Sequence, residues 1–201
     1  QDSIMNKSEE KKDKILRIAQ ILFAKYGLFK TSVDDIAKMG KMGKSSIYYY
    51  FESKEEIFKN VLEKEMTTLL GKVKSAIDEA KTPSGKLKGY IISRMKNVKE
   101  LAIIYSTLRD EYMIHYAFIQ KFRENFDREE IGIIRDILAE GVKKKVFAVK
   151  NIELTSYAIG TAVKGLEYDW AIKLKEEDIE NNINCLLDVL FYGIMDPAMN
   201  S

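Results

Sequence analysis

Residues Thr31 to Phe51 hold a set of side chains that could contact DNA together. The segment reads TSVDDIAKMGKMGKSSIYYYF, in which Gly40 and Gly43 separate two short stretches of mixed apolar and polar residues, with lysines on both sides. This arrangement predicts two short helices joined by a tight corner. It is typical of a helix-turn-helix, whose second helix enters the major groove of DNA with its N-terminal residues nearest the bases.

We expect seven residues of this region to contact DNA. Serine hydroxyls at the start of the second helix can pair with several base edges, and a tyrosine ring one turn later can pack on a thymine methyl. Lysine, threonine and tyrosine side chains near them can bind phosphates. The expected base contacts are Lys44, Ser45, Ser46 and Tyr48, and the expected phosphate contacts are Thr31, Lys44, Tyr49 and Lys54.

The same stretch also has a purely structural interpretation, in which its apolar residues are core and its lysines form a solvated face. We accept this interpretation for Ile47, Tyr50 and Phe51. Because three adjacent tyrosines on one helix cannot all face inward, we expect Tyr48 and Tyr49 to point outward.

Longer helices must position this stretch, and the composition favours helices throughout. The chain has 201 residues, of which 46% are hydrophobic and 32% are charged, and it contains only two prolines. Apolar residues recur every three or four positions over residues 11–26 and again after residue 53, as in amphipathic helices. We therefore expect an all-α protein of about nine helices.

Capping and turn residues suggest where these helices begin and end. Gly27 supplies a left-handed stop, Ser53 and Glu56 form a capping box, and the TPSG at residues 82–85 separates two helices. Helices are expected to start near residues 33, 44, 53 and 86 and to cover about 103–115, 118–144, 152–174 and 176–194. The polar residues 1–12 are expected to form a frayed arm.

Charge, cysteine and histidine content narrow the class of protein. Residues 1–60 hold 12 basic and 9 acidic residues, so the positive excess lies at the N-terminal end. The single cysteine, Cys185, and the single histidine, His115, exclude an intrachain disulfide and a multi-histidine metal site. No run of about 18 apolar residues occurs. We expect a cytoplasmic protein that needs neither a metal nor a cofactor.

Residues 15–58 resemble the DNA-binding segment of the tetracycline-repressor (TetR) family. The resemblance rests on the spacing of Ile15, Ala19, Leu22, Phe23, Gly27, Thr31, Ile36-Ala37, Lys44, Tyr48 to Phe51 and Ser53-Lys54-Glu55. It implies a helix-turn-helix DNA-binding domain over residues 1–52 and a helical ligand-sensing and dimerisation domain over residues 53–201. The implied function is that of a transcriptional regulator, a repressor that a small inducer releases from a palindromic operator.

The corner between the two short helices departs from the family pattern. Where the family usually has Ala-Gly-Val-Ser, this chain has Gly40-Lys41-Met42-Gly43, so Lys41 stands at the position of the left-handed glycine. Holding a non-glycine residue there costs about 1–2 kcal/mol. We expect either that Gly40 becomes left-handed or that Lys41 accepts the strain. Ser45 also stands where the family often has glycine.

We expect a homodimer, because one two-turn helix buries too little of the groove for selective binding. The helix over residues 152–174 has one face of mostly small residues, which permits close approach of a second helix, and one face of bulky residues. The expected interface residues are Leu154, Ala158, Ala162, Gly165, Ile179, Ile183, Leu186, Leu187 and Leu190. The alternative is that both faces are core within one chain.

Residues 90–170 are rich in aromatic residues and methionine. The resemblance implies that this region binds a small inducer, and the residue content indicates a largely apolar cavity with few polar groups. The candidate contacts are Tyr90, Arg94, Met95, Tyr105, Arg109, Tyr112, His115, Phe118, Phe122, Phe126 and Trp170. Core packing is the alternative for each aromatic residue, and a structural hydrogen bond is the alternative for His115.

Two other classes of protein fit the sequence less well. An enzyme acting on an acyl or aromatic substrate would need catalytic groups that one histidine, one cysteine and no glycine-rich phosphate loop do not provide, so we expect no enzymatic activity. A helical carrier of small molecules, or an interaction protein without DNA binding, is favoured only by the unusual corner. Salt-dependent binding to a selected palindrome would separate these classes.

Overall fold

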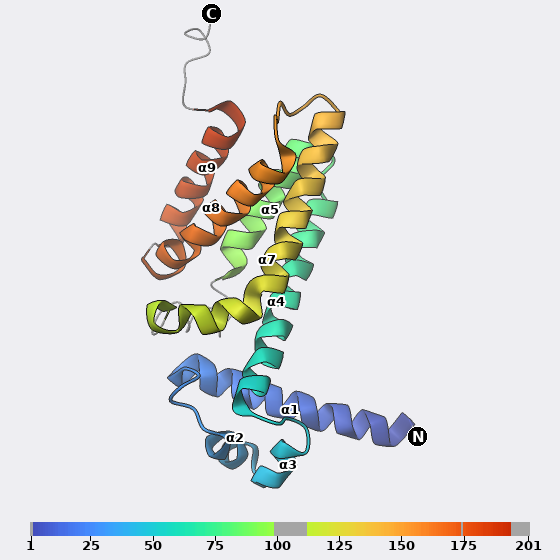
Figure 1. Cartoon of the computed structure of the whole chain (residues 1–201), viewed down its shortest axis with the longest axis vertical. Coiled ribbons are helices and arrows are strands. Elements are labelled where there is room, and N and C mark those ends of the chain that lie inside the picture. The colour runs from blue at the N-terminus through green and yellow to red at the C-terminus, as the bar shows by residue number, and fades with distance from the viewer. Residues whose placement is uncertain (1, 99–111, 174, 194–201) are drawn as a thin grey trace, which may run out of the picture. The chain divides into compact units, whose positions relative to one another are not determined.

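The structure is a computed structural model that describes residues 2–98, 112–173 and 175–193. Every regular element in these residues is an α-helix (Figure 1), which confirms the all-α class. The helix expected at about 103–115 lies largely outside the described residues. The chain forms two compact units, Gln1–Gly71 with Asn97–Glu129 and Lys72–Lys96 with Glu130–Ser201.

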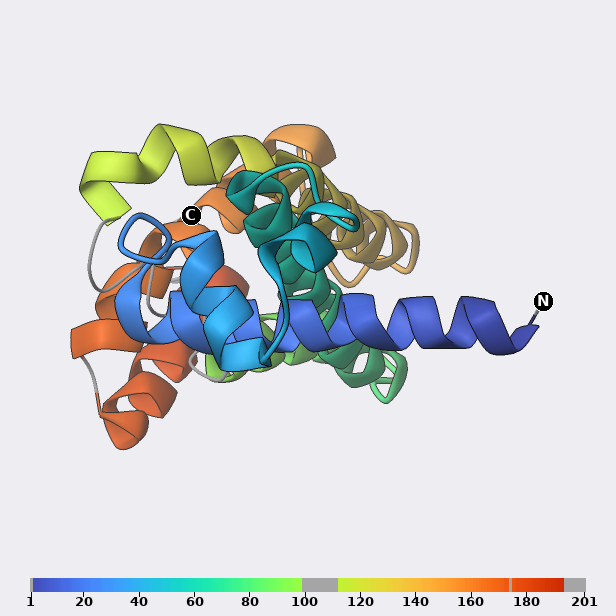
Figure 2. The same cartoon turned by 90° about the horizontal axis from the view of Figure 1, so that it is seen from below.

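The first unit contains α1 (Asp2–Tyr26), α2 (Val33–Gly40), α3 (Lys44–Tyr48) and the first part of α4 (Lys54–Asp78). Figure 1 shows α2 and α3 together beneath α1, and Figure 2, seen from below, shows them in front of it. Their apolar faces meet in a core that includes Ala19, Ile36 and Ile47. The rings of Phe23 and Phe58 pack edge to face with centroids 5.6 Å apart and tie α1 to α4.

Local signals set the helix boundaries of this unit as the sequence predicts. Gly27 is left-handed, with φ of 83°. Ser32 caps α2 in a capping box with Asp35, and hydrogen bonds from the hydroxyl and the backbone N–H of Ser32 lower the pKa of the Asp35 carboxyl. At α4, the N–H of Glu56 donates to the Ser53 hydroxyl at 3.1 Å.

Helix α1 begins earlier than expected, at Asp2 and not near residue 11. The expected frayed arm is therefore helical, and most of the side chains from Lys7 to Lys14 in these added turns are exposed. Lysine and glutamate favour helix without needing a core contact. An ion pair of 3.2 Å between Asp13 and Lys64 also links this part of α1 to α4.

The second unit contains α5 (Pro83–Val98), the last part of α7 (Tyr112–Lys143), α8 (Ile152–Lys173) and α9 (Glu176–Tyr192). Helix α5 begins at Pro83 and not near Lys86, because proline suits the first helical position and the Thr82 hydroxyl accepts the N–H of Gly85. The core of the unit includes Ile91 of α5, Val163 of α8 and other aliphatic side chains.

The described helices include none that is both long enough and apolar enough to span a membrane. In the same residues, no three His, Cys, Asp or Glu side chains are grouped in a way that could hold a metal ion.

Candidate nucleic-acid interface

Helix α3 is fixed by two buried residues and presents the rest of its side chains outward. Ile47 and Phe51 are almost completely buried, so the helix cannot rotate without exposing them. Lys44, Ser45, Ser46, Tyr48 and Tyr49 are exposed, with Tyr48 at 52% and Tyr49 at 80%. Five of the seven expected DNA contacts therefore lie together on one exposed stretch.

Tyr48 and Tyr49 are exposed as the sequence predicts, whereas Tyr50, which was expected in the core, is only partly buried. Tyr50 is half-buried, and its ring packs edge to face on Tyr49 with centroids 4.9 Å apart. Tyr48 and Tyr49 point outward, and exposed apolar groups that gather in one patch often mark interaction sites.

Lys44 is not a free cation in the structure. Its ammonium lies 2.6 Å from the carboxylate of Asp34, and both side chains are about half exposed. This pair joins α2 to the start of α3. Because an exposed ion pair is weak, a phosphate could replace the carboxylate, but Asp34 then competes with it.

The corner adopts the second of the two expected conformations. Lys41 is left-handed with φ of 51°, and Gly40 has no positive φ. The N–H of Lys41 donates to Lys38 at 3.2 Å and the N–H of Met42 donates to Ala37 at 3.0 Å, which closes the end of α2. From α1, the Lys14 ammonium donates to the Gly40 carbonyl at 3.0 Å.

Two residues that were expected to contact phosphates already make hydrogen bonds within the fold. Thr31 is buried, and its hydroxyl donates to the carbonyls of Gly27 at 2.8 Å and Leu22 at 3.3 Å. The Lys54 ammonium donates to the carbonyl of Leu28 at 2.9 Å. Thr31 thus seals the end of α1, while Lys54 is half-buried and still has two N–H groups that could reach a phosphate.

A hollow of about 390 Å³ lies beside these residues, lined among others by Lys30, Lys44, Tyr48 and Lys54. Lys30 is exposed and was not among the expected contacts. Its position two residues before the cap of α2 carries no local signal, because only the folded chain brings it near Lys44. The hollow combines three lysines and one tyrosine ring with the single carboxylate of Asp34, so its positive excess suits an anionic group.

The residues expected to sense an inducer are only partly described. Tyr105 and Arg109 lie outside the described residues, as do the side chains of Tyr112, His115, Phe118, Phe122 and Trp170. In the second unit Tyr90, Arg94 and Met95 are buried, and in the first unit Phe126 is half-buried.

Arg94 is the centre of a buried charged cluster that joins three helices. Its guanidinium donates to Glu130 of α7 and to Glu167 of α8, and all three residues are buried. Burial alone would lower the pKa of Arg94, but the two carboxylates outweigh burial and raise it. Its Nη1 makes no hydrogen bond within the described part of the chain. The sequence analysis included Arg94 but missed both glutamates.

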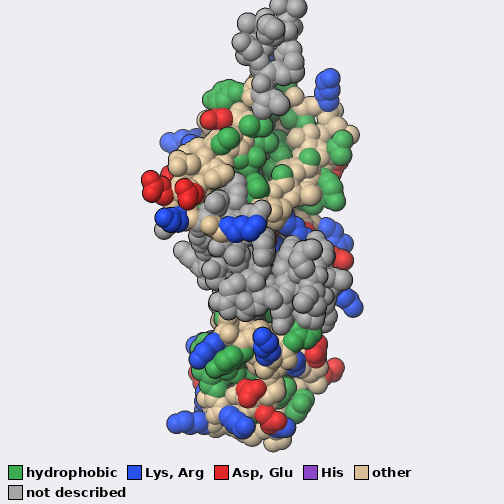
Figure 3. All heavy atoms as spheres, turned by 90° about the vertical axis from the view of Figure 1, so that its left-hand side faces the viewer, with side chains coloured by type: hydrophobic (Ala, Val, Ile, Leu, Met, Phe, Trp, Pro, Cys, Tyr) green, Lys and Arg blue, Asp and Glu red, His purple; other side chains and the backbone are tan. Residues whose placement is uncertain are grey.

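The expected interface residues fall into two groups. On α8, Leu154, Ala158, Ala162 and Gly165 are exposed, with Leu154 at 64%. On α9, Ile179, Ile183 and Leu187 are buried within the chain itself, while Leu186 and Leu190 are half-buried. Figure 3 shows hydrophobic side chains gathered on the face of the second unit that carries α8 and α9.

Comparison with known proteins gives a consistent result. The model of the family described as bacterial regulatory proteins, tetR family, matches residues 15–61. An uncharacterised helix-turn-helix regulator, YhgD of Bacillus subtilis, is 27% identical over 81% of this chain and 85% of its own. The transcriptional repressor KstR2 of Mycolicibacterium smegmatis is 30% identical over 66% of this chain and 65% of its own.

Solved structures share the fold over nearly the whole chain. A TetR-family regulator from Syntrophomonas wolfei has a TM-score of 0.79 at 21% identity and covers 94% of this chain and 98% of its own. The regulator FadR of Bacillus subtilis, solved in complex with stearoyl-CoA, has a TM-score of 0.74 at 20% identity over 90% of this chain and 98% of its own.

Proposed function

We propose that this chain, which belongs to the TetR family of bacterial regulatory proteins, represses transcription from a palindromic operator and is released by a small, largely apolar inducer. The observation that carries the proposal is the exposed stretch of α3. Ser45, Ser46 and Tyr48 stand outward on a helix that Ile47 and Phe51 hold in place. We assign DNA binding to residues 1–52 and ligand sensing and dimerisation to residues 53–201.

In the proposed complex α3 lies in the major groove. Lys44, Ser45, Ser46 and Tyr48 contact base edges, in line with the usual docking of a recognition helix. Tyr49, Lys54 and Lys30 contact phosphates, and Lys44 does so when it leaves Asp34. Thr31 supports the site indirectly, because its buried hydroxyl fixes the turn before α2.

The homodimer is proposed to form through the exposed stripe of α8. Leu154, Ala158, Ala162 and Gly165 recur at intervals of three and four, so they share one face of the helix. Small residues let a second helix approach closely. On α9 only Leu186 and Leu190 of the expected interface residues are half-buried, and we assign them to the same interface.

The inducer is proposed to bind beside Arg94, next to Tyr90 and Met95 of α5. The buried, unpartnered Nη1 of Arg94 supports a polar contact there, and the two apolar neighbours support an otherwise hydrophobic ligand. FadR of Bacillus subtilis, with its stearoyl-CoA, offers a precedent for a ligand with a long apolar chain. Ligand and operator must weaken each other's binding by the same factor.

The experiment that tests the proposal is selection of bound duplexes from a random pool, followed by sedimentation with and without the selected DNA. We expect an enriched palindrome and two chains per duplex. Ala158→Arg, which places a charge in the α8 stripe, should give monomers with weak operator binding, whereas Lys143→Glu, a charge change at an exposed site outside the stripe, should leave the dimer intact. A pool without any enriched palindrome would overturn the proposal.

A further inference from the structure

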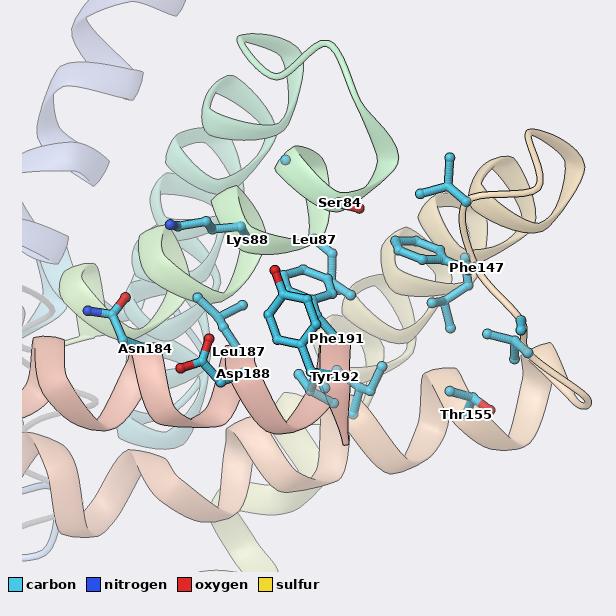
Figure 4. A pocket seen from close by; sticks show the side chains of 17 residues that line it. Ser84, Leu87, Lys88, Phe147, Thr155, Asn184, Leu187, Asp188, Phe191 and Tyr192 are labelled. Atoms are coloured by element: carbon cyan, nitrogen blue, oxygen red, sulfur yellow. The ribbon is translucent and has the colours of Figure 1, made fainter. Parts of the chain in front are cut away.

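A hollow in the second unit has no residue in common with the proposed inducer contacts. It has a volume of about 670 Å³ and lies between the start of α5, residues 146–149, the start of α8 and the end of α9 (Figure 4). Its floor consists of the buried side chains Leu87, Leu138, Ile159 and Leu187. Small-molecule sites commonly measure about 300–1,000 Å³ and are lined mainly by apolar groups.

One wall of this hollow is aromatic and firmly placed. The rings of Phe147 and Phe191 are nearly parallel, at 14°, with centroids 6.4 Å apart. Phe147 rests against Gly141 of α7, where an added Cβ would come within 2.0 Å of the ring. The turn that brings Phe147 there depends on Lys145, which is left-handed with φ of 56°, and on N–H bonds from Val146 and Phe147 to the Gly141 carbonyl.

The aromatic wall continues at the end of α9. Tyr192 lines the hollow although its side chain is 78% exposed. Figure 4 shows the ring of Tyr192 beside that of Phe191. An apolar ring that lies on this wall would cover side chains that otherwise face water.

The opposite end of the hollow is polar and carries both signs of charge. Figure 4 shows Lys88, Asn184 and Asp188 on the other side of the Phe191 and Tyr192 rings from Phe147. All three residues are exposed, and their side chains form no ion pair or hydrogen bond with another described residue. Lys88 and Asp188 therefore offer one cation and one anion that are not already used in the fold.

We propose that this hollow binds a zwitterion with an aromatic body, the chemistry shared by aromatic amino acids and their short peptides. The ring lies against Phe147 and Phe191, the ammonium group pairs with Asp188, and the carboxylate pairs with Lys88 and the amide of Asn184. A guest with a single charge would leave one of the two charged side chains without a partner and beside a like charge. The proposal concerns the free chain and does not depend on operator binding.

The test is isothermal titration of the full chain with four probes that share one phenyl group. They are L-phenylalanine, the dipeptide L-phenylalanyl-L-phenylalanine, the anion 3-phenylpropionate and the cation phenethylamine. We expect one site per chain and binding of at least one zwitterion about 1.5- to 5-fold tighter than either singly charged probe, as one exposed ion pair provides. If L-phenylalanine binds more tightly than the dipeptide, the natural ligand is a free amino acid; the reverse order indicates a peptide.

Two variants assign the binding to this hollow. Lys88→Met should weaken the zwitterion and 3-phenylpropionate but not phenethylamine, and Asp188→Asn should weaken the zwitterion and phenethylamine but not 3-phenylpropionate. The matched controls are Lys81→Met and Asp178→Asn, which make the same changes at exposed sites outside the hollow. All four side chains are exposed, so the variants should fold.

Three results would overturn the proposal. The first is the absence of saturable binding of all four probes at millimolar concentration. The second is equal affinity for the singly charged and the zwitterionic probes, which would mean that Lys88 and Asp188 do not contribute to recognition. The third is an unchanged affinity in both Lys88→Met and Asp188→Asn. None of these results bears on the selection of an operator, so the proposed function would stand or fall separately.

Discussion

Replacing Asp34 with asparagine should strengthen DNA binding, because Asp34 competes with DNA for the ammonium of Lys44. The ion pair of 2.6 Å joins α2 to the first residue of α3. Lys44 can give its full charge to a phosphate only when it leaves this carboxylate. Asparagine keeps the shape of the aspartate side chain and removes its charge.

The expected magnitude follows from the exposure of the pair. Exposed ion pairs contribute about 0.2–1 kcal/mol, so their loss should tighten binding by about 1.5- to 5-fold for each recognition helix. A lysine that becomes available to a phosphate should also make the slope of log K against log salt steeper by about 0.9. In a homodimer the free energies of the two recognition helices add, so the gain in affinity is squared, to about 2- to 25-fold, and the change in slope is doubled.

The assay is fluorescence anisotropy with the selected operator and with a scrambled duplex, at several salt concentrations. Asp34→Asn should tighten binding to both duplexes. Asp13→Asn is the matched control, because it removes the same charge and a comparable exposed ion pair, with Lys64, at α1 and α4 of the same unit. The reasoning is refuted if Asp13→Asn has an equal effect, or if Asp34→Asn tightens binding as much when Lys44 has been changed to glutamine.

Three further predictions test other parts of the chain. Tyr48→Ala should weaken operator binding by about 1 kcal/mol per half-site with little change in stability, whereas Tyr26→Ala, at a similarly exposed ring of α1, should not. Arg94→Met should lower the free energy of unfolding in urea by about 3–5 kcal/mol, because it removes the buried cation that pairs with Glu130 and Glu167; Arg135→Met, at an exposed site, should cost less than about 1 kcal/mol. Hydrogen bonds from Lys144, just after α7, and from Lys86 of α5 lower the pKa of Glu140 from 4.5 to about 2, so its stabilising effect is complete above the unfolded pKa and is lost as the pH falls from 4.5 to 2. Glu140→Gln should flatten that part of the stability profile, and an unchanged profile in thermal melts would count against the pairing.

Features that depend on neighbours in the sequence could be predicted well. The left-handed Gly27, the capping of α4 by Ser53 and the burial of Ile47 and Phe51 all follow from residues within four positions of each other. The strain at Lys41 was one of two expected outcomes, because only the register of α2 decides which residue ends it.

Features that join distant segments could not be predicted in the same way. Lys54 binds the Leu28 carbonyl, 26 residues earlier in the chain, and the Thr31 hydroxyl reaches the carbonyl of Leu22 in α1, nine residues earlier. Residue types alone place both among phosphate-binding candidates. Their role in the fold depends on how α1, α2 and α4 pack, which no local pattern encodes.

The cluster around Arg94 could be predicted only in part. Its partners Glu130 and Glu167 are 36 and 73 residues away. A signal did exist, since Glu130 falls four residues after Phe126 and four before Ile134, within the apolar stripe of α7. A carboxylate in an apolar stripe requires a buried cation, and Arg94 was the cation available on α5.

The corner before α3 fixes the position of that helix in the free chain, so the entropy cost of ordering it is part of folding and not of DNA binding. Lys41 is held in its strained conformation by the closed end of α2, and the Lys14 ammonium binds the Gly40 carbonyl from α1. These contacts exist in the free chain, so α3 is preorganised relative to α2 before any duplex is met. Differences in affinity between duplexes should then reflect contacts made in the groove and not the ordering of the protein.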